Sequence, residues 1–220
     1  GSLTQGTTTA LNAILEGKIA RTGLITNRGF RDLLEIGRER RPEMYNLLQE
    51  KPPPLVPREL RREVGQRSDY RGETLSPLDL DEVDVIVSDF LSDGVRAVAV
   101  ALLHSYASPE AEAEIKARIA EIAPDLSVSA SHEVLSEYRE YERLCLTILN
   151  ASLMPVMDRY LEGFTSGVGD VLQPDVRLMM THSAGGLMTF ETARDRPIQS
   201  ALSGPSAGVS AAAAVGAAVG

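Results

Sequence analysis

The fold class follows from two glycine-rich strings, Ser183-Ala-Gly-Gly-Leu-Met188 and Leu202-Ser-Gly-Pro-Ser-Ala-Gly208. The segment 176–180 ahead of the first string is apolar and short, which predicts a buried strand that ends in a tight turn at Gly185-Gly186. Ser203 and Pro205 in the second string are typical of a helix N-terminus, so we predict a helix over 207–218. A strand, a glycine turn and a helix in quick succession indicate an α/β fold.

Glycine-rich turns that open helices are suited to anions, because the first N–H groups of a helix are unpaired and its dipole is positive there. A third helix start, Gly6-Thr-Thr-Thr9, precedes a helical pattern over 10–16. We therefore predict nucleotide or phosphate contacts from six residues at these turns: Thr7, Thr8, Gly185, Gly186, Ser203 and Gly204. The alternative is that the turns are only tight strand-to-helix connections, since none matches a dinucleotide fingerprint or a P-loop.

The middle of the chain continues the α/β pattern. A continuous apolar run over 95–103 predicts a strand buried on both faces of a parallel sheet. Helical patterns over 79–91 and from residue 108 flank this strand, and 126–130 predicts another strand. The longest helical pattern, 137–161, contains Pro155, so we expect a kink or break near Met154. We predict a mixed or parallel sheet with flanking helices.

The chain divides at a segment rich in helix breakers, Ser166-Gly-Val-Gly169 with Gln173-Pro174. We predict a first α/β lobe over 1–165 and the start of a second lobe, or a hinge segment, over 166–220. A proline-rich excursion over 40–57 interrupts the first lobe, because prolines at this density sustain neither a helix nor a strand.

Composition limits the partners. The formal net charge of −9 argues against a nucleic-acid partner, because phosphate backbones are bound by clustered Lys and Arg. The single cysteine, Cys145, lies in an apolar helical pattern, and the sequence shows no signal peptide and no apolar run long enough to span a membrane. We expect a cytoplasmic protein with no membrane contact.

Histidines follow three predicted strands, with His182 after the third, at the edge where open parallel sheets commonly bind ligands. His104 follows the strand over 95–103, and His132 follows the strand over 126–130, so both are candidates for a substrate cleft. Each could instead be a structural histidine that binds a loop carbonyl. No spacing of His, Cys or carboxylates indicates a metal site, and no catalytic residue can be identified from the sequence pattern.

Seven short strings occur in one order along the chain: Gly6-Thr-Thr-Thr-Ala-Leu-Asn-Ala-Ile-Leu-Glu16, Arg21-Thr-Gly-Leu-Ile-Thr26, Gly29-Phe-Arg-Asp-Leu-Leu-Glu-Ile-Gly-Arg38, Leu102-Leu-His-Ser-Tyr106, Ser131-His-Glu-Val134, Glu140-Tyr-Glu-Arg143 and Leu202-Ser-Gly-Pro205. Together they resemble the hydantoinase A/oxoprolinase family, which includes N-methylhydantoinases, 5-oxoprolinases and related subunits of acetone carboxylases. The resemblance implies part of a sugar kinase/actin-like ATPase fold.

The resemblance also implies a function. The parent protein would be an ATP-dependent hydrolase of a small cyclic amide of the hydantoin or 5-oxoproline type, which uses ATP to activate the substrate carbonyl. It would use Mg²⁺ and a hydantoinase B-like partner. The family's two D-x-G-G-T phosphate motifs do not occur here, so we expect a fragment that is inactive alone and binds no cofactor tightly. The alternatives are an acetone carboxylase-type subunit and a non-catalytic binding or scaffolding domain with this fold.

One prediction concerns the glycines of the last helix. Gly204 and Gly208 are expected where another backbone or a ligand approaches too closely for a Cβ atom. Replacing Gly208 by Val should then destabilise the protein.

Overall fold

A computed structural model describes residues 1–39, 45–46, 48, 52–168 and 176–219. Two compact units make up the chain: unit 1 comprises Gly1–Ala20 with Ser152–Gly220, and unit 2 comprises Arg21–Ala151. Their limits differ from those of the lobes predicted over 1–165 and 166–220, which stay a prediction. Part of the predicted excursion over 40–57, at 40–44, 47 and 49–51, lies outside the described residues.

Unit 2 is built on a four-stranded parallel sheet with the strand order β3-β2-β6-β7. The strands are β2 (Thr22–Asn27), β3 (Arg61–Val64), β6 (Ala97–Val100) and β7 (Ser127–Ala130). All residues of β2 and β6 are buried, as expected for strands covered on both faces. The strand predicted within 95–103 is thereby confirmed.

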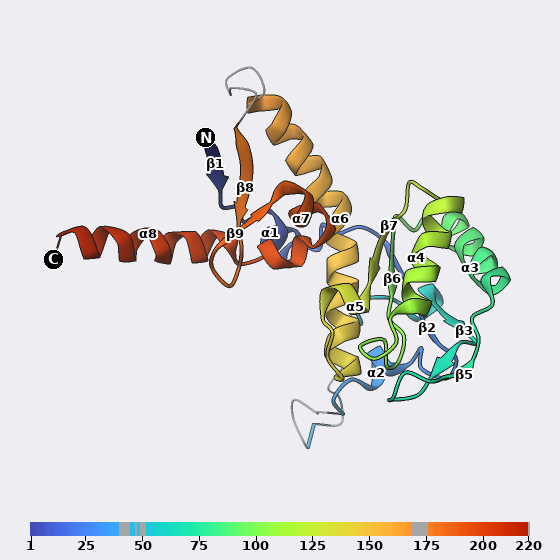
Figure 1. Ribbon diagram of the computed structural model, residues 1–220. Helices are drawn as coiled ribbons and strands as arrows, with labels where there is room; N and C mark the ends of the chain where they lie inside the picture. Colours follow the sequence, from blue (N-terminus) through green and yellow to red (C-terminus); the bar gives the residue numbers. More distant parts are fainter. Residues whose placement is uncertain (40–44, 47, 49–51, 169–175, 220) are drawn as a thin grey trace. The chain divides into compact units, whose positions relative to one another are not determined.

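Helices cover both faces of this sheet (Figure 1). On one face lie α3 (Leu80–Ser92) and α4 (Glu110–Ile122), whose apolar side chains point to the sheet. The N-terminal part of α6 (Glu140–Val168) covers the other face. Smaller elements complete the unit: α2 (Leu33–Ile36), the 3₁₀ helix η1 (Arg58–Leu60), the hairpin of β4 (Arg67–Ser68) with β5 (Thr74–Ser76), and α5 (Ser131–Val134).

Unit 1 is built on a three-stranded mixed sheet with the order β1-β8-β9. β1 (Ser2–Gln5) runs parallel to β8 (Arg177–Thr181), and β9 (Leu187–Thr189) is antiparallel to β8. The helices are α1 (Thr9–Leu15), α7 (Phe190–Asp195), η2 (Pro197–Ser200), α8 (Ser203–Val219) and the C-terminal part of α6. Its core is formed by eight buried side chains: Ala10, Ala13, Leu153, Met157, Leu161, Met180, Met188 and Ala193.

The structure differs from the sequence-based expectation at two local positions. The turn at Gly185-Gly186 joins two antiparallel strands and does not open a helix, because the N–H of His182 donates to the carbonyl of Gly186 at 3.0 Å and closes a hairpin. α6 shows no break at Met154 and continues to Val168, with Pro155 inside it. Burial of Leu153 and Met157 on either side of the proline stabilises the helix there.

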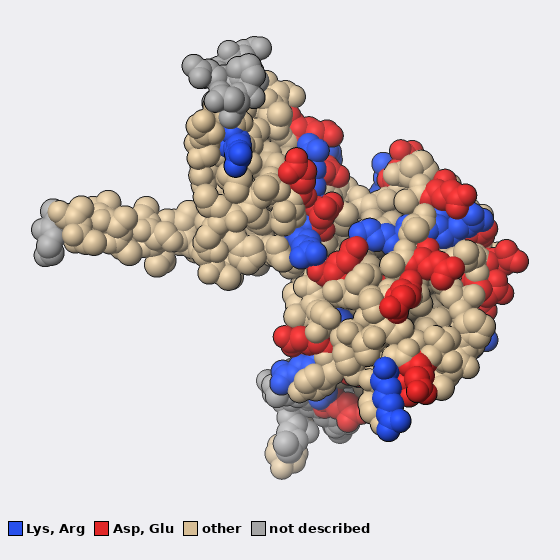
Figure 2. Space-filling view, viewed as in Figure 1, with Lys and Arg blue, Asp and Glu red and all other residues tan. Residues whose placement is uncertain are grey.

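The last helix is uncharged. α8 contains no Asp, Glu, Lys or Arg, so it stays free of red and blue in Figure 2, whereas charges of both signs are interspersed over unit 2. Residues 208–218 of α8 are exposed. No described helix is both long and apolar enough to cross a membrane.

Candidate functional site

In unit 1 the loop 6–8 packs on the first turn of α8. The hydroxyl of Ser203 accepts a hydrogen bond from the N–H of Thr7 at 3.2 Å and donates one to the carbonyl of Thr7 at 2.9 Å. Ser203 is fully buried and Thr7 nearly so. This hydroxyl therefore holds the loop and does not cap its own helix, as the sequence had suggested it could.

Two glycines allow this contact. A Cβ atom on Gly204 would lie 3.2 Å from Cγ2 of Thr8, and one on Gly6 would lie 3.3 Å from Cβ of Ala207. Both distances are shorter than an ordinary carbon–carbon contact. At Gly204 the close neighbour is thus the Thr8 side chain, while the predicted close backbone is absent, since the Thr7 carbonyl oxygen would lie at an ordinary 3.7 Å. The prediction of close approach is wrong for Gly208, where an added Cβ atom would meet no described atom within 4 Å apart from the adjacent backbone of α8, because the helix has already left the loop.

The hairpin turn lies beside the same helix start. The Ser183 hydroxyl donates to the carbonyl of Gln199 at 2.6 Å and accepts from the N–H of Leu202 at 2.9 Å. Two residues further on, Gly185 and Gly186 have φ angles of 90° and 81°, which favour glycine. Within unit 1 the structure thus brings all three predicted phosphate-binding segments to one junction.

The segments at this junction do not contain all the groups that a complete nucleotide site needs. The hydroxyl of Thr7 pairs with that of Thr9 at 2.8 Å, and the exposed Thr8 accepts from the side chain of Asn12 at 3.2 Å. No residue of the loop 6–8, the turn 182–186 or the first turn of α8 is Lys or Arg. A polyphosphate needs cationic or metal partners, which these segments do not supply.

In unit 2 a buried polar network lies at the carboxyl ends of the parallel strands. Asn27, at the end of β2, accepts the N–H of Leu103 at 2.6 Å, and its amide nitrogen donates to Oε1 of Gln66 at 3.1 Å. The strand order reverses between β2 and β6, where open α/β sheets commonly bind ligands.

His132 belongs to this edge and is held by Glu112, a residue that the sequence analysis did not single out. The carboxylate of Glu112 is completely buried. One of its oxygens accepts the N–H of Leu102 at 2.7 Å and the hydroxyl of Ser131 at 2.6 Å. The other accepts the backbone N–H of His132 at 2.9 Å and lies 2.8 Å from its Nδ1. Glu112 thereby joins the ends of β6 and β7.

A buried arginine lies near this carboxylate. Arg143 on α6 donates to the carbonyl of Leu102 at 2.7 Å and to that of Glu137 at 2.7 Å. Its Nε has no partner among the described residues, and its guanidinium lies 5.8 Å from the ring centre of Tyr106. Burial lowers the pKa of Arg143, while the negative charge of Glu112 opposes that shift.

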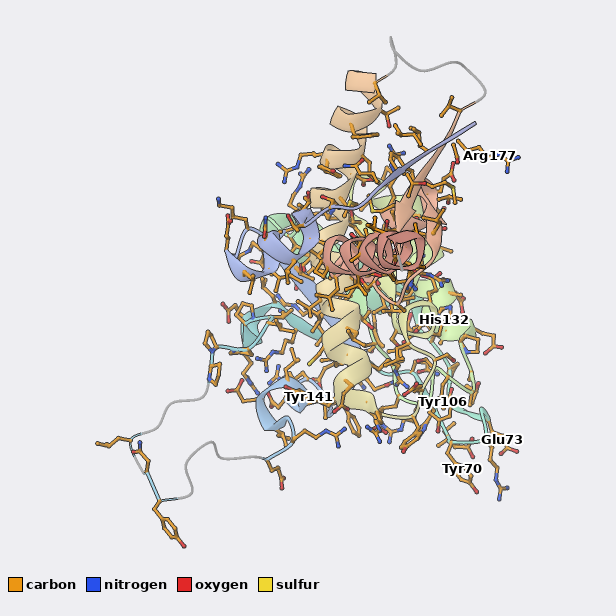
Figure 3. All side chains as sticks on the ribbon, turned by 90° about the vertical axis from the view of Figure 1, so that its left-hand side faces the viewer. Tyr70, Glu73, Tyr106, His132, Tyr141 and Arg177 are labelled. Atoms are coloured by element: carbon orange, nitrogen blue, oxygen red, sulfur yellow. The ribbon has the colours of Figure 1, made fainter. Side chains whose placement is uncertain are left out.

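His104 also follows β6, and its ring contacts Tyr106 and not His132 among the described residues. Its φ angle is 59°, and its ring packs edge-on against Tyr106 with Nδ1 3.4 Å from the tyrosine hydroxyl. Figure 3 shows where Tyr106 and His132 lie among the side chains of unit 2. No group of three or more His, Cys, Asp or Glu side chains suited to a metal occurs among the described residues.

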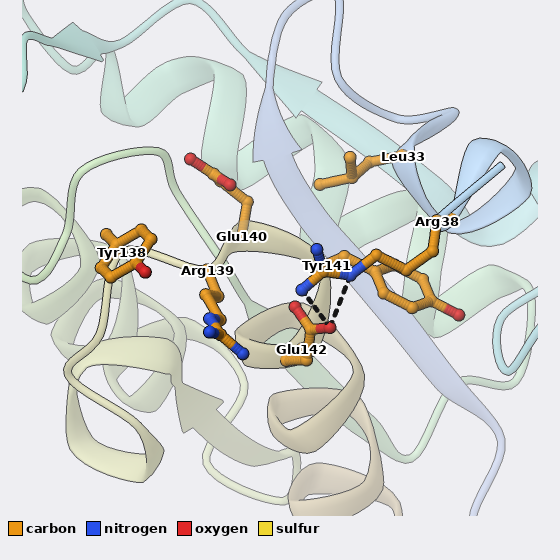
Figure 4. Close-up of a pocket in the computed structure, with 8 residues that line it drawn as sticks. Leu33, Arg38, Tyr138, Arg139, Glu140, Tyr141 and Glu142 are labelled. Carbon is orange, nitrogen blue, oxygen red and sulfur yellow. Dashed lines mark hydrogen bonds and ion pairs between the residues drawn. The ribbon is translucent and has the colours of Figure 1, made fainter.

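A pocket of about 590 Å³ lies in unit 2 between α2 and the start of α6 (Figure 4). The pair of Arg38 and Glu142 bridges the two helices, with Nε of the arginine 2.7 Å from the carboxylate. This hydrogen bond lowers the pKa of Glu142. None of the residues predicted from the sequence as site residues lines this pocket.

Two family models match the chain. The model of the hydantoinase/oxoprolinase N-terminal region matches residues 1–123, and that of hydantoinase/oxoprolinase matches residues 143–220. The caprolactamase subunit alpha of Pseudomonas jessenii is 35% identical over 91% of this chain and 29% of its own length. The 5-oxoprolinase of Dictyostelium discoideum is 30% identical over 94% of this chain and 18% of its own.

Two solved structures show the same fold. The crystal structure of an ATP-dependent caprolactamase from Pseudomonas jessenii superposes with a TM-score of 0.82 at 35% identity, over 91% of this chain and 29% of that one. The nucleotide-free structure of acetone carboxylase superposes with a TM-score of 0.80 at 25% identity, over 99% and 32%. The chain thus spans less than a third of each of these relatives. Its α/β fold class is confirmed, and the chain belongs to the hydantoinase/oxoprolinase family.

Proposed function

We propose that this chain is part of an ATP-dependent hydrolase of small cyclic amides, of the hydantoin or 5-oxoproline type, in which ATP activates the substrate carbonyl. The observation that carries the proposal is the likeness to an ATP-dependent caprolactamase over 91% of the chain, at 35% identity and a TM-score of 0.82. The 5-oxoprolinase relatives act on the same chemical group, an amide within a ring.

We propose roles for the residues that the sequence analysis predicted as site residues. Thr7, Thr8, Ser203 and Gly204 would shape the loop that supports the nucleotide, beside the turn that carries Gly185 and Gly186. Bound ATP would supply a phosphoryl group that activates the amide oxygen. Residues outside this chain would provide the cations or Mg²⁺ for the phosphates. His104 and His132 would face the substrate from the carboxyl edge of the unit 2 sheet.

A second candidate rests on two other similarities. The acetophenone carboxylase gamma subunit of Aromatoleum aromaticum is 32% identical over 92% of the chain, and the acetone carboxylase structure has the TM-score of 0.80 given above. In that case ATP would activate a ketone for carboxylation. The relatives named as subunits also support a partner chain, for which we propose a hydantoinase B-like subunit.

One panel of assays separates the two candidates. The intact protein that contains this chain is purified with its B-type partner, and ATP hydrolysis is followed with hydantoin, 5-oxoproline or a lactam, and separately with a ketone and bicarbonate. Ring opening in step with ATP hydrolysis supports the cyclic-amide function. ATP turnover that depends only on ketone and bicarbonate overturns it in favour of the carboxylase. We expect the 220-residue chain alone to be inactive in both assays.

A further inference from the structure

The hydrogen-bonded pair of Glu112 and His132 is unusual in its burial. The Glu112 side chain is fully buried, while the His132 side chain is 19% exposed. Burying a carboxylate is costly unless hydrogen bonds replace its water, and here donors reach both of its oxygens. The protein therefore fixes the position and direction of one partly exposed imidazole through a buried acceptor.

This arrangement fixes the tautomer of the ring. Backbone N–H groups donate to both oxygens of Glu112, so the carboxylate acts as an acceptor toward Nδ1 of His132 as well. The ring proton of the neutral imidazole then lies on Nδ1, and Nε2 presents a lone pair. Among the described residues, the hydrogen bonds of His132 to Glu112 use its backbone N–H and Nδ1, and none involves Nε2.

We propose that Nε2 of His132 accepts a hydrogen bond from the ring N–H of a cyclic amide substrate. This inference rests on the proposed function and narrows it to lactams with an unsubstituted nitrogen. A neutral acceptor complements an N–H donor, whereas a ketone or an N-alkylated lactam offers no such donor. His132 would thus select for cyclic amides against the ketones used by the carboxylase relatives.

The competing explanation is that His132 only ties strand ends together. The network shows that its ring is not needed for that purpose, because Leu102, Ser131 and the backbone N–H of His132 still bind Glu112 without the imidazole. His132→Phe therefore keeps these three bonds and a ring, but removes both ring nitrogens. Glu133→Gln is the matched control, because it changes the adjacent residue, whose carboxylate pairs with Lys116 at 2.7 Å.

The tautomer is tested first, by ¹⁵N NMR of the histidine-labelled chain over a pH series, which identifies the signals of the neutral ring. The chain has three histidines, and the signals that disappear in His132→Phe identify this one. We expect a protonated Nδ1 and an unprotonated Nε2. A proton on Nε2 in the neutral ring overturns the proposal, whatever the enzyme does.

Selectivity is tested in the intact protein with its partner, with an unsubstituted lactam and its N-methyl derivative. We expect KM for the unsubstituted lactam to rise roughly 3- to 10-fold in His132→Phe, the size of one net hydrogen bond, and preference over the N-methyl lactam to fall equally. Glu133→Gln should keep both values. If His132→Phe keeps the preference for the unsubstituted lactam, the proposed role of His132 is overturned, while the proposed function stands. A wild-type enzyme that opens no cyclic amide overturns the proposed function and this ligand with it.

Discussion

Single hydroxyl groups and single glycines define the junction in unit 1. Ser203 and Thr7 lie 196 positions apart, yet one hydroxyl satisfies both the N–H and the carbonyl of Thr7. These residues were predicted as phosphate contacts because of their types and their place at helix starts. The structure shows a positioning role for Ser203, and only the side chain of Thr8 stays exposed in this loop.

The glycines of α8 allow a direct comparison at this scale. Gly204→Val should destabilise the chain relative to Gly208→Val by about 1–3 kcal/mol, because only the first places atoms against Thr8. Gly208→Ala should stabilise it by up to about 1 kcal/mol, since alanine is the better helix former. Urea unfolding of the three variants measures these differences. Equal midpoints for the two valine variants would contradict the close contact at Gly204.

Cys145 provides a test based on pH. Burial raises the pKa of the Cys145 thiol, and the hydrogen bond with Tyr141 partly offsets that rise. Because the thiolate is the reactive form, the folded chain at pH 8 should react with a thiol reagent more slowly than the chain unfolded in urea. Tyr141→Phe removes the offsetting bond and should slow the reaction further. A faster reaction in Tyr141→Phe would show that access, and not ionisation, controls this thiol.

At the scale of elements, the packing of α3 on β2 depends on the absence of a side chain. Gly23 lies in β2, and a Cβ atom there would come within 2.6 Å of the ring of Phe90 on α3. Gly23→Ala should therefore destabilise the chain by about 1–3 kcal/mol, because the buried ring has to move. Gly163→Ala on α6 is the control, since no described atom lies within 4 Å of that position. Thermal unfolding that ranks the two variants equally would rule out this contact.

The elements that the sequence predicts well are those with a strong local pattern. The run over 95–103 contains β6, and the stripe of Val83, Ile86 and Phe90 is the buried face of α3. Glu112 could not be found in this way, because it lies among charged residues at a helix start and its partners follow two different strands, β6 and β7. The hairpin at 182–186 was missed because a glycine pair after a strand permits either a strand or a helix to follow.

At the scale of the whole molecule, pairing between strands that are far apart in the sequence determines which segments form each compact unit. β1 pairs with β8, so residues 1–20 belong to the same compact unit as 152–220. Periodicity describes neighbours in sequence, and it contains no information on such long-range pairing. The predicted division near residue 165 followed local helix breakers, whereas the compact units follow the strand pairing.

The central claim is that ATP activates the carbonyl of a cyclic amide in the intact protein. The most direct measurement uses a lactam labelled with ¹⁸O in its carbonyl group, the intact protein with its partner, and mass spectrometry of the phosphate released from ATP. Phosphorylation of the amide oxygen predicts that ¹⁸O appears in inorganic phosphate as the ring opens. Ring opening with no ¹⁸O in the phosphate would contradict the claim.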